Sequence, residues 1–254
     1  MNSCNKRREQ IAAFVNKEGF ASIQRIREAF PSVSDVTLRK DLSYLDSTMR
    51  LIRMHGGAKS LPEAIGQLDN HGTRLAKNVE SKKIIAAKAC TLLQENQSVF
   101  IAAGTTCIEF VKALPPNLKL QFFTDGLATA MELSKCSDRE ITVFGGELDC
   151  TLMRISGTKV LSELSNLRFD YAFFSANGYR QEYGFVCQHP YFYSLLQTMR
   201  EHTEKMVILM DSSKINSIRS ARIFSPSKVD IVVGDDQYDA ATINSLKKYN
   251  VTVL

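Results

Sequence analysis

The chain lacks the features that mark membrane and secreted proteins. No apolar run approaches the length that spans a membrane, and the opening residues Met1 to Arg8 contain no apolar core of a secretory signal. Internal repeats and low-complexity tracts are absent as well. We therefore expect a cytoplasmic protein without a membrane partner.

The six cysteines and four histidines also lack the spacing of a metal site or a disulfide framework. Most cysteines lie in apolar or helical surroundings, so reduced and mostly buried thiols are expected. No two histidines have the sequence spacing of a pair of metal ligands. The sequence thus predicts no metal and no cofactor; the cysteines are at positions 4, 90, 107, 136, 150 and 187.

Most of the chain lacks net charge. The first 60 residues hold 11 Lys and Arg against 6 Asp and Glu, whereas the remaining 21 basic and 21 acidic residues cancel, so the whole +5 lies in the first 60. A basic module joined to a neutral one is expected where only one part contacts phosphate. The length of 254 residues favours two domains.

A DNA recognition helix is predicted from Ser34 onward. Ser34 is a good N-cap, and Leu38, Leu42 and Leu45 recur at helical spacing and so face a core. The opposite side and its flanks carry side chains that can reach phosphates and base edges, namely Val36, Thr37, Arg39, Lys40 and Ser43.

The neighbouring segments complete a winged helix-turn-helix over residues 1–58. Ile11, Phe14 and Val15 mark one amphipathic helix, Ser22 caps a second, and Pro31 ends it. A β-wing follows, with an apolar run that carries Arg53 before a Gly-Gly turn. In such a module the third helix enters the major groove. The predicted DNA-binding residues are Arg8, Ser34, Val36, Thr37, Arg39, Lys40, Ser43, Tyr44, Arg53 and His55.

Residues 59–76 suit a linker, and residues 77–254 alternate apolar strands with helical patterns. This alternation predicts an α/β domain with a mainly parallel sheet. We expect helices around 79–94, 106–113, 127–136, 191–203 and 239–249. The expected strands are Val99–Ala103, Leu120–Thr124, Ile141–Phe144, Tyr171–Ser175, Met206–Met210, Val229–Val233 and Val251–Leu254.

Five of these strands end in small and polar residues, where ligands of open α/β sheets bind. Glycines let a backbone approach an anion, and hydroxyls and helix amides supply donors. Their convergence predicts an anion pocket for a small-molecule effector. Its residues are Gly104, Thr105, Thr106, Thr124, Asp125, Gly126, Gly145, Gly146, Asn177, Gly178 and Lys214.

Over nearly its whole length the chain resembles the DeoR/GlpR family of bacterial transcriptional regulators. The first part matches the family's helix-turn-helix signature through Arg7–Ile11, Val33–Leu42 and Arg53–Gly57. The second part resembles the family's sensor domain through the strand-end motifs and Arg74, Asn78, Lys82, Ser156-Gly157 and Asp211–Lys214.

The resemblance implies a sensor related to ribose-phosphate isomerase and coenzyme A transferase folds, with a phosphorylated sugar as usual effector. It also implies a repressor of carbohydrate genes that binds a double-stranded DNA operator. A single winged module buries little area, so we expect a homo-oligomer on repeated half-sites, joined through the sensor domain.

The chain departs from the family at two places. Ala102 stands where the family commonly has Asp, and Tyr191–Gln197 stands where it has an acidic residue and a lysine. Both departures remove polar groups from the pocket, so an unusual or less charged effector, or none, also fits. We expect Tyr191, Phe192 and Tyr193 to pack rather than stack on a ligand.

Two other functions stay open. The sensor half could be an active isomerase or transferase fused to a DNA-binding module, although Ala102 cannot transfer a proton. Asp125, Glu147, Asp149 and Asp211 are the remaining acids for such chemistry, although acidic residues at loop starts are usually caps. An effector-independent regulator would bind DNA without responding to a ligand.

Overall fold

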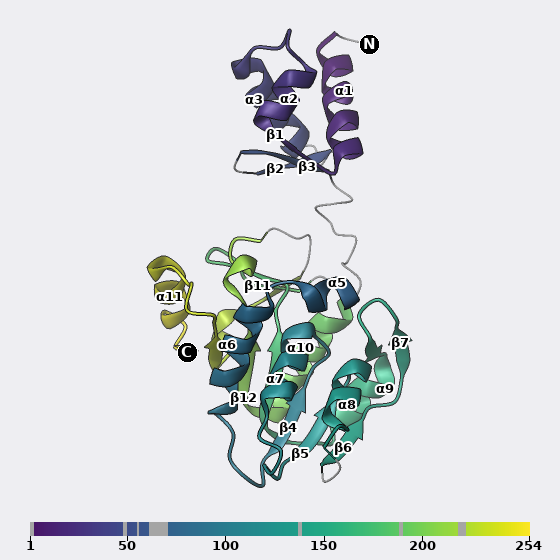
Figure 1. Cartoon of the computed structure of the whole chain (residues 1–254), viewed down its shortest axis with the longest axis vertical. Helices are drawn as coiled ribbons and strands as arrows, with labels where there is room; N and C mark the ends of the chain where they lie inside the picture. The colour runs from purple at the N-terminus through teal and green to yellow at the C-terminus, as the bar shows by residue number, and fades with distance from the viewer. Residues whose placement is uncertain are drawn as a thin grey trace. The chain divides into compact units, whose positions relative to one another are not determined.

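The computed structural model describes residues 3–47, 50–54, 56–60, 71–136, 139–187, 190–217 and 222–254. The chain divides into two compact units, Met1–Leu68 and Asp69–Leu254 (Figure 1). No helix within the described ranges is long and apolar enough to cross a bilayer. His55, one of the predicted DNA-binding residues, lies outside the described residues.

The first unit is a winged helix-turn-helix, as predicted. Its strands form one antiparallel sheet in the order β1-β3-β2, and the helices pack over a core that includes Ile11, Val15, Ile26 and Leu42. The elements are α1 (Ser3–Glu18), β1 (Phe20–Ser22), α2 (Ile23–Ala29), α3 (Asp35–Ser47), β2 (Leu51–Met54) and β3 (Gly57–Ser60).

Helix boundaries in this unit follow the predicted caps. The Ser22 hydroxyl accepts a hydrogen bond from the Arg25 amide at 3.1 Å, and the Ser34 hydroxyl accepts one from the Thr37 amide at 3.3 Å. Helix α2 ends at Ala29, two residues before Pro31. The caps satisfy first-turn amides that the helices themselves leave unbonded.

The second unit is an α/β domain with one seven-stranded sheet, in which every strand pairing is parallel, as predicted. The strand order is β15-β14-β12-β9-β4-β5-β6. Its strands are β4 (Ser98–Ile101), β5 (Gln121–Thr124), β6 (Glu140–Val143), β9 (Phe169–Ser175), β12 (Thr203–Leu209), β14 (Ile231–Val233) and β15 (Thr252–Val253).

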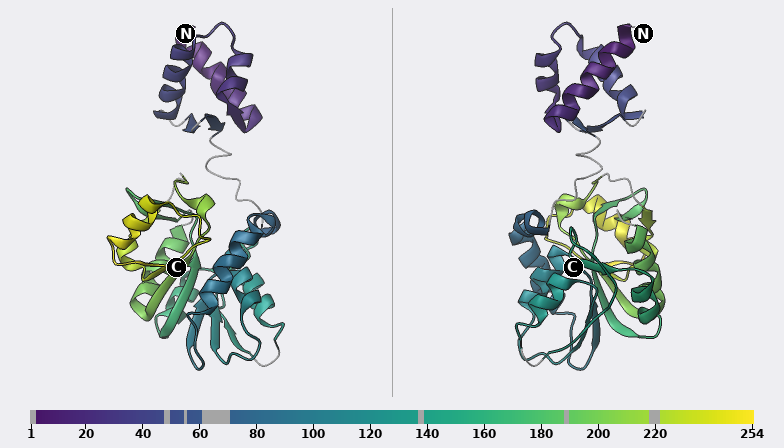
Figure 2. Two further views of the ribbon diagram at one scale, coloured as in Figure 1. Left: turned by 60° about the vertical axis from the view of Figure 1, so that its left-hand side comes forward. Right: turned by 90° about the vertical axis from the view of Figure 1, so that its right-hand side faces the viewer.

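Helices cover both faces of this sheet. Successive side chains of a strand point to opposite faces, so each strand packs against helices on both sides. Phe173 packs with helices α6 and α7, whereas its neighbour Phe174 belongs to the core beneath α10 and α11. Figure 2 shows the blue and teal helices on one side and the green and yellow ones on the other. The helices are α5 (His71–Ala76), α6 (Val79–Cys90), α7 (Thr105–Ala113), α8 (Leu127–Leu133), α9 (Thr158–Leu164), α10 (Pro190–His202) and α11 (Ala240–Lys247).

Several short elements were not anticipated from the sequence. The antiparallel hairpin of β7 (Glu147–Asp149) and β8 (Arg154–Ser156) follows β6 in the chain and precedes α9. A second small sheet joins β10 (Gly178–Arg180), β11 (Gly184–Cys187) and β13 (Arg222–Phe224). Segments of three or four residues are too short to show a period.

The predicted linker 59–76 contains regular structure at both ends. Strand β3 runs through Ser60, where Leu51 is its partner, and helix α5 occupies His71–Ala76. The first unit therefore extends past residue 58. Pairing across the sheet, which local composition does not report, sets that boundary.

Candidate DNA-binding surface and effector site

Helix α3 exposes a basic face on the side away from its core. Leu38, Leu42 and Leu45 are buried, so the opposite side of the helix is exposed. The side chains of Arg39 and Lys40 form no ion pair or hydrogen bond within the described part of the chain. The exposed side chains of this face are Val36, Arg39, Lys40, Ser43 and Tyr44.

A buried carboxylate holds two arginines of α1 against α3. Asp41, 1% exposed, accepts hydrogen bonds from Arg7 Nε at 2.7 Å and Arg8 Nε at 2.8 Å. Burial alone would raise the pKa of Asp41, but the two guanidinium groups outweigh it and hold the pKa below its usual value. The Arg8 guanidinium also lies over the Tyr44 ring, 3.8 Å from its centroid. Asp41 thereby orients both arginines beside the exposed face of α3.

The wing is joined to the recognition helix by Arg53. Its Nη1 atom donates to the Ser43 hydroxyl at 2.8 Å, and its backbone amide donates to Asp46 Oδ1 at 3.0 Å. Arg53 remains exposed. The structure therefore places the predicted phosphate contact of the wing next to the predicted reading face of the helix.

In the second unit the chain reverses direction across the sheet between β4 and β9. From β4 it runs outward through β5 to β6, then returns to β9 and continues through β12, β14 and β15. Neighbouring loops at such a switch point diverge to opposite faces, which leaves a crevice beyond the carboxyl ends of the strands. The residues after β4, β9 and β12 define this place.

A polar cluster occupies the switch point. Lys214 Nζ donates to the Ser175 hydroxyl at 3.0 Å, and that hydroxyl donates to Thr106 Oγ1 at 3.4 Å. Lys214 also lies 3.7 Å from the Asp211 carboxylate. We call this set, with Asn78 and Ser213, the switch-point cluster: Asn78, Thr106, Ser175, Asp211, Ser213 and Lys214.

Asn78 brings helix α6 into the cluster. Its Nδ2 atom donates to Asp211 Oδ1 at 3.0 Å and to the Ser213 hydroxyl at 2.9 Å. Burial lowers the pKa of Lys214, and Asp211 opposes that shift. A half-buried ammonium group thus stands among three hydroxyls, which is a suitable environment for an anionic or hydroxyl-rich ligand.

Three predicted effector residues lie buried on the β5 side instead. Thr124 Oγ1 donates to the Ile101 carbonyl at 2.6 Å and accepts from the Gly126 amide at 2.9 Å. Asp125 is 0% exposed and accepts from the Ala103 amide at 2.7 Å. A Cβ at Gly126 would lie 2.9 Å from the Ala103 Cα atom. These residues fasten the loop after β5 to the end of β4.

Arg154 is the partner that sequence reasoning did not identify for Asp125. Its Nε atom lies 3.4 Å from Asp125 Oδ2, and Nη2 donates to the Ala103 carbonyl at 3.0 Å. Burial raises the pKa of Asp125, and the Arg154 charge opposes that shift. Nothing local in the sequence links these two residues, which stand 29 positions apart.

Two of the remaining predicted glycines, Gly146 and Gly178, lie in close contact with neighbouring backbone. A Cβ at Gly146 would lie 2.4 Å from the Ser156 carbonyl oxygen, and one at Gly178 would lie 3.2 Å from the Ser217 carbonyl oxygen. Gly145 and Asn177 are half-buried at their strand ends. Gly104 precedes α7, whose first residue Thr105 is nearly buried, so both stand beside Thr106 of the cluster.

The two departures from the family pattern are both core positions. Ala102 is fully buried in the core. Phe192 is nearly buried, lies 6.0 Å from Phe174 between ring centroids, and carries the Arg154 guanidinium 4.7 Å from its own centroid. Tyr191 and Tyr193 pack against the same core. The expectation that these aromatic side chains pack is therefore confirmed.

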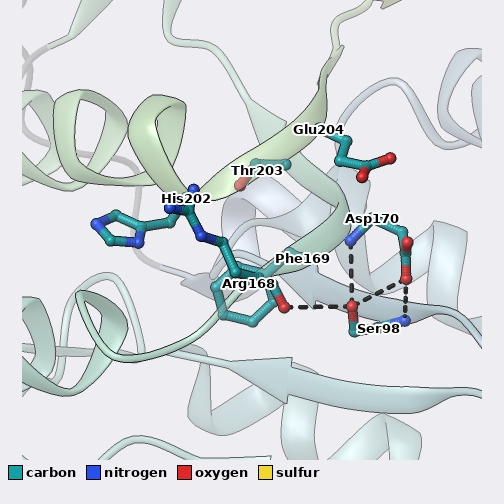
Figure 3. A pocket seen from close by; sticks show the side chains of 7 residues that line it. All are labelled: Ser98, Arg168, Phe169, Asp170, His202, Thr203 and Glu204. Carbon is teal, nitrogen blue, oxygen red and sulfur yellow. Dashed lines mark hydrogen bonds between the residues drawn. The ribbon is translucent and has the colours of Figure 1, made fainter.

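A hollow of about 350 Å³ lies at the opposite, amino-terminal ends of β4, β9 and β12. In Figure 3 the Ser98 hydroxyl and amide both reach the Asp170 carboxylate, at 2.9 Å and 2.7 Å. The Ser98 hydroxyl also donates to the Arg168 carbonyl. These hydrogen bonds join β4 to β9, so the polar groups that line the hollow hold neighbouring strands together.

No group of three or more histidine, cysteine or acidic side chains that could hold a metal ion occurs among the residues that the structure describes.

A winged helix-turn-helix unit joined to an α/β unit with a polar switch point defines a DNA-binding regulator with a sensor domain. The chain belongs to the DeoR family: residues 77–236 match the DeoR C-terminal sensor domain, and residues 7–64 match the DeoR-like helix-turn-helix domain.

Curated relatives are similar across most of the chain. The HTH-type transcriptional regulator GolR of Listeria innocua is 30% identical, over 82% of this chain and 82% of its own. The lactose phosphotransferase system repressor of Streptococcus mutans is 28% identical, over 96% of each chain. GlpR of Haloferax volcanii is 26% identical, over 98% of this chain and 96% of its own.

Among solved structures, ribose 5-phosphate isomerase A from Methanocaldococcus jannaschii is similar over 55% of each chain, with a TM-score of 0.40 and 15% identity. A likeness at this level says nothing about activity.

Proposed function

We propose that this protein is a cytoplasmic repressor of carbohydrate genes that leaves its operator when its sensor domain binds a small phosphorylated sugar. Among its relatives is a lactose phosphotransferase system repressor, which supports a role in carbohydrate regulation. We further propose a homo-oligomer, in which the unit Met1–Leu68 acts as the DNA-binding domain and the unit Asp69–Leu254 acts as the sensor.

The switch-point cluster is the observation that carries the sensing half of this proposal. Lys214 supplies the positive charge, and Thr106 and Ser175 supply hydroxyls. The Ser175 hydroxyl lies 3.0 Å from the Lys214 ammonium group and 3.4 Å from the Thr106 hydroxyl. A phosphate monoester accepts hydrogen bonds on several oxygens, and a lysine can pair with it as a point charge. Of the predicted effector residues, Thr106 and Lys214 are members of the switch-point cluster, and Gly104 and Thr105 directly precede Thr106 in the chain.

The basic face of α3 supports the DNA-binding half. Arg39, Arg53 and the pair of arginines held by Asp41 would contact phosphates, while Thr37, Lys40 and Ser43 would face base edges. Phosphate contacts fix the register of the protein on the duplex, and base contacts supply the specificity. Two such modules in one oligomer would read two half-sites.

Catalysis by the sensor is the second candidate, and the burial of Asp125 argues against it. A catalytic acid or base must reach the proton that it transfers. Asp125 has no exposed surface and is paired with Arg154, and Ala102 has no proton to give. Asp211 is the acid within the switch-point cluster, where it accepts hydrogen bonds from Asn78 and Ser213.

A thermal-shift screen of the full chain tests the sensing half, because a ligand that binds the native state raises the melting temperature. Phosphorylated sugars are compared with the same sugars lacking phosphate. We expect stabilisation by a phosphorylated sugar, and its loss in Lys214→Gln but not in Lys112→Gln, which removes a surface lysine paired with Glu109. If no phosphorylated sugar shifts the melting temperature, the sensing half of the proposal is wrong and the effector-independent regulator is favoured.

A further inference from the structure

The first turn of α3 exposes an apolar side chain where a reading helix meets base edges. Val36 is 64% exposed, and no other large apolar side chain in the described part of the chain is more exposed. It is the second residue of α3. In helix-turn-helix proteins the N-terminal residues of this helix contact bases in the major groove.

Val36 points directly away from the core of its unit. At about 100° per residue, Val36, Lys40 and Ser43 share one stripe of the helix. Leu38, Leu42 and Leu45 occupy the other side and are buried. The stripe therefore faces whatever the helix docks onto.

The polar groups around Val36 are already engaged. The Ser34 and Thr37 hydroxyls lie 2.9 Å apart and share a hydrogen bond, while Asp35 accepts one from Arg27 at 2.6 Å. Each of these groups therefore already has a hydrogen-bond partner within the protein. Val36 loses no such bond when it leaves water, because its side chain is apolar.

We propose that Val36 reads the 5-methyl group of a thymine in the major groove, so that the operator half-site carries a T·A pair at this position. The thymine methyl is the apolar group that the groove presents for such a contact. This inference rests on the proposed DNA binding and specifies its sequence preference.

Lys40 sets the neighbouring preference. It lies one turn after Val36 on the same stripe of the helix, about 6 Å along the helix axis. A lysine in the major groove pairs with O6 and N7 of guanine. We therefore expect a G·C pair close to the T·A pair in the half-site.

The test uses the full chain and a library of random duplexes, from which bound sequences are selected. The selected duplex is then made with deoxyuridine in place of each thymine in turn, which removes only the methyl group. For the wild type we expect one such replacement to weaken binding about fourfold, which corresponds to about 0.8 kcal/mol for one buried methyl-sized group.

Two substitutions at position 36 distinguish the causes. Val36→Ser, which has no methyl group, is expected to bind the thymine and deoxyuridine duplexes equally. Val36→Ile keeps apolar contact and should retain the difference. The proposal is overturned if no replacement weakens wild-type binding, or if Val36→Ser keeps the same sensitivity. Selection of no motif at all would instead refute the proposed DNA-binding function.

Discussion

Arg154 lies 3.4 Å from Asp125, and both side chains are almost fully buried beside the end of β4. The pair binds the Ala103 amide through Asp125 and the Ala103 carbonyl through Arg154. The β5 loop and the β7-β8 hairpin are thereby tied to the strand that precedes the switch-point cluster. This relationship makes Asp125 a support for the site and leaves the half-buried Lys214 as the positive charge of the cluster.

Replacing Asp125 by Ala is expected to lower the free energy of unfolding by about 3–5 kcal/mol, because it leaves the Arg154 charge buried without its partner. Urea unfolding of the full chain measures this loss. Asp125→Ala combined with Arg154→Met should cost less than the sum of the single changes. Additive effects would show that the two charges do not stabilise each other.

Lys82 is expected to stabilise the end of α5. Its ammonium group is buried and donates to the carbonyls of Arg74 at 2.5 Å and Leu75 at 3.4 Å. Hydrogen bonds from a charged donor are worth about 1.5–3 kcal/mol. Lys82→Met should therefore speed hydrogen exchange in residues 71–76. Lys83→Met, which removes only a surface pair with Glu80, should leave exchange there unchanged.

Arg39 and Arg53 are each expected to contribute one phosphate contact. Alanine at either position should weaken binding to all duplexes alike and reduce the slope of log affinity against log salt by about 0.9. Fluorescence anisotropy across a salt series gives both quantities. Lys40→Ala should instead cost roughly 1–3 kcal/mol at its cognate base pair. An unchanged salt slope for both arginine variants would contradict the assigned face.

Asp41 should make the first unit sensitive to acid. Because its folded pKa is held below the unfolded value of about 3.9, the ionised carboxylate stabilises the fold above that pH. This contribution is lost as the pH falls through the lowered folded pKa. Calorimetry of the full chain should show Asp41→Asn to be less stable than the wild type at pH 7. The stability of the variant should also change less than that of the wild type between pH 5 and pH 3, an interval chosen about the reference pKa. Parallel profiles for both proteins would refute this role.

Strong periodic patterns explain which parts of the fold were predictable. The inner strands of the large sheet are buried apolar runs such as Val99–Ala103, whereas the edge strands β6 and β15 are largely exposed. The leucines of α3 repeat at helical spacing. Both signals are local in the chain. Strand β1 carries no such signal, since Phe20 is held in place by its pairing with Lys59, far along the chain.

The candidate site was predictable in its location but only partly in its residues. Strand ends rich in small and polar residues could be inferred from composition, which singled out Thr106 and Lys214. The switch point depends on the strand order, which the structure supplied. Whether a polar side chain faces the crevice or the core depends on packing, as the buried Thr124 and Asp125 demonstrate. Ser175 was overlooked because it ends a predicted strand.

The coupling between ligand and DNA is the central claim, and one titration tests it. Affinity of the full chain for a selected duplex is measured by anisotropy with and without a saturating concentration of the sugar phosphate that stabilises it most. We predict that the ligand weakens DNA binding by at least about fivefold, a typical allosteric coupling. An affinity that stays unchanged while the ligand is demonstrably bound would contradict it.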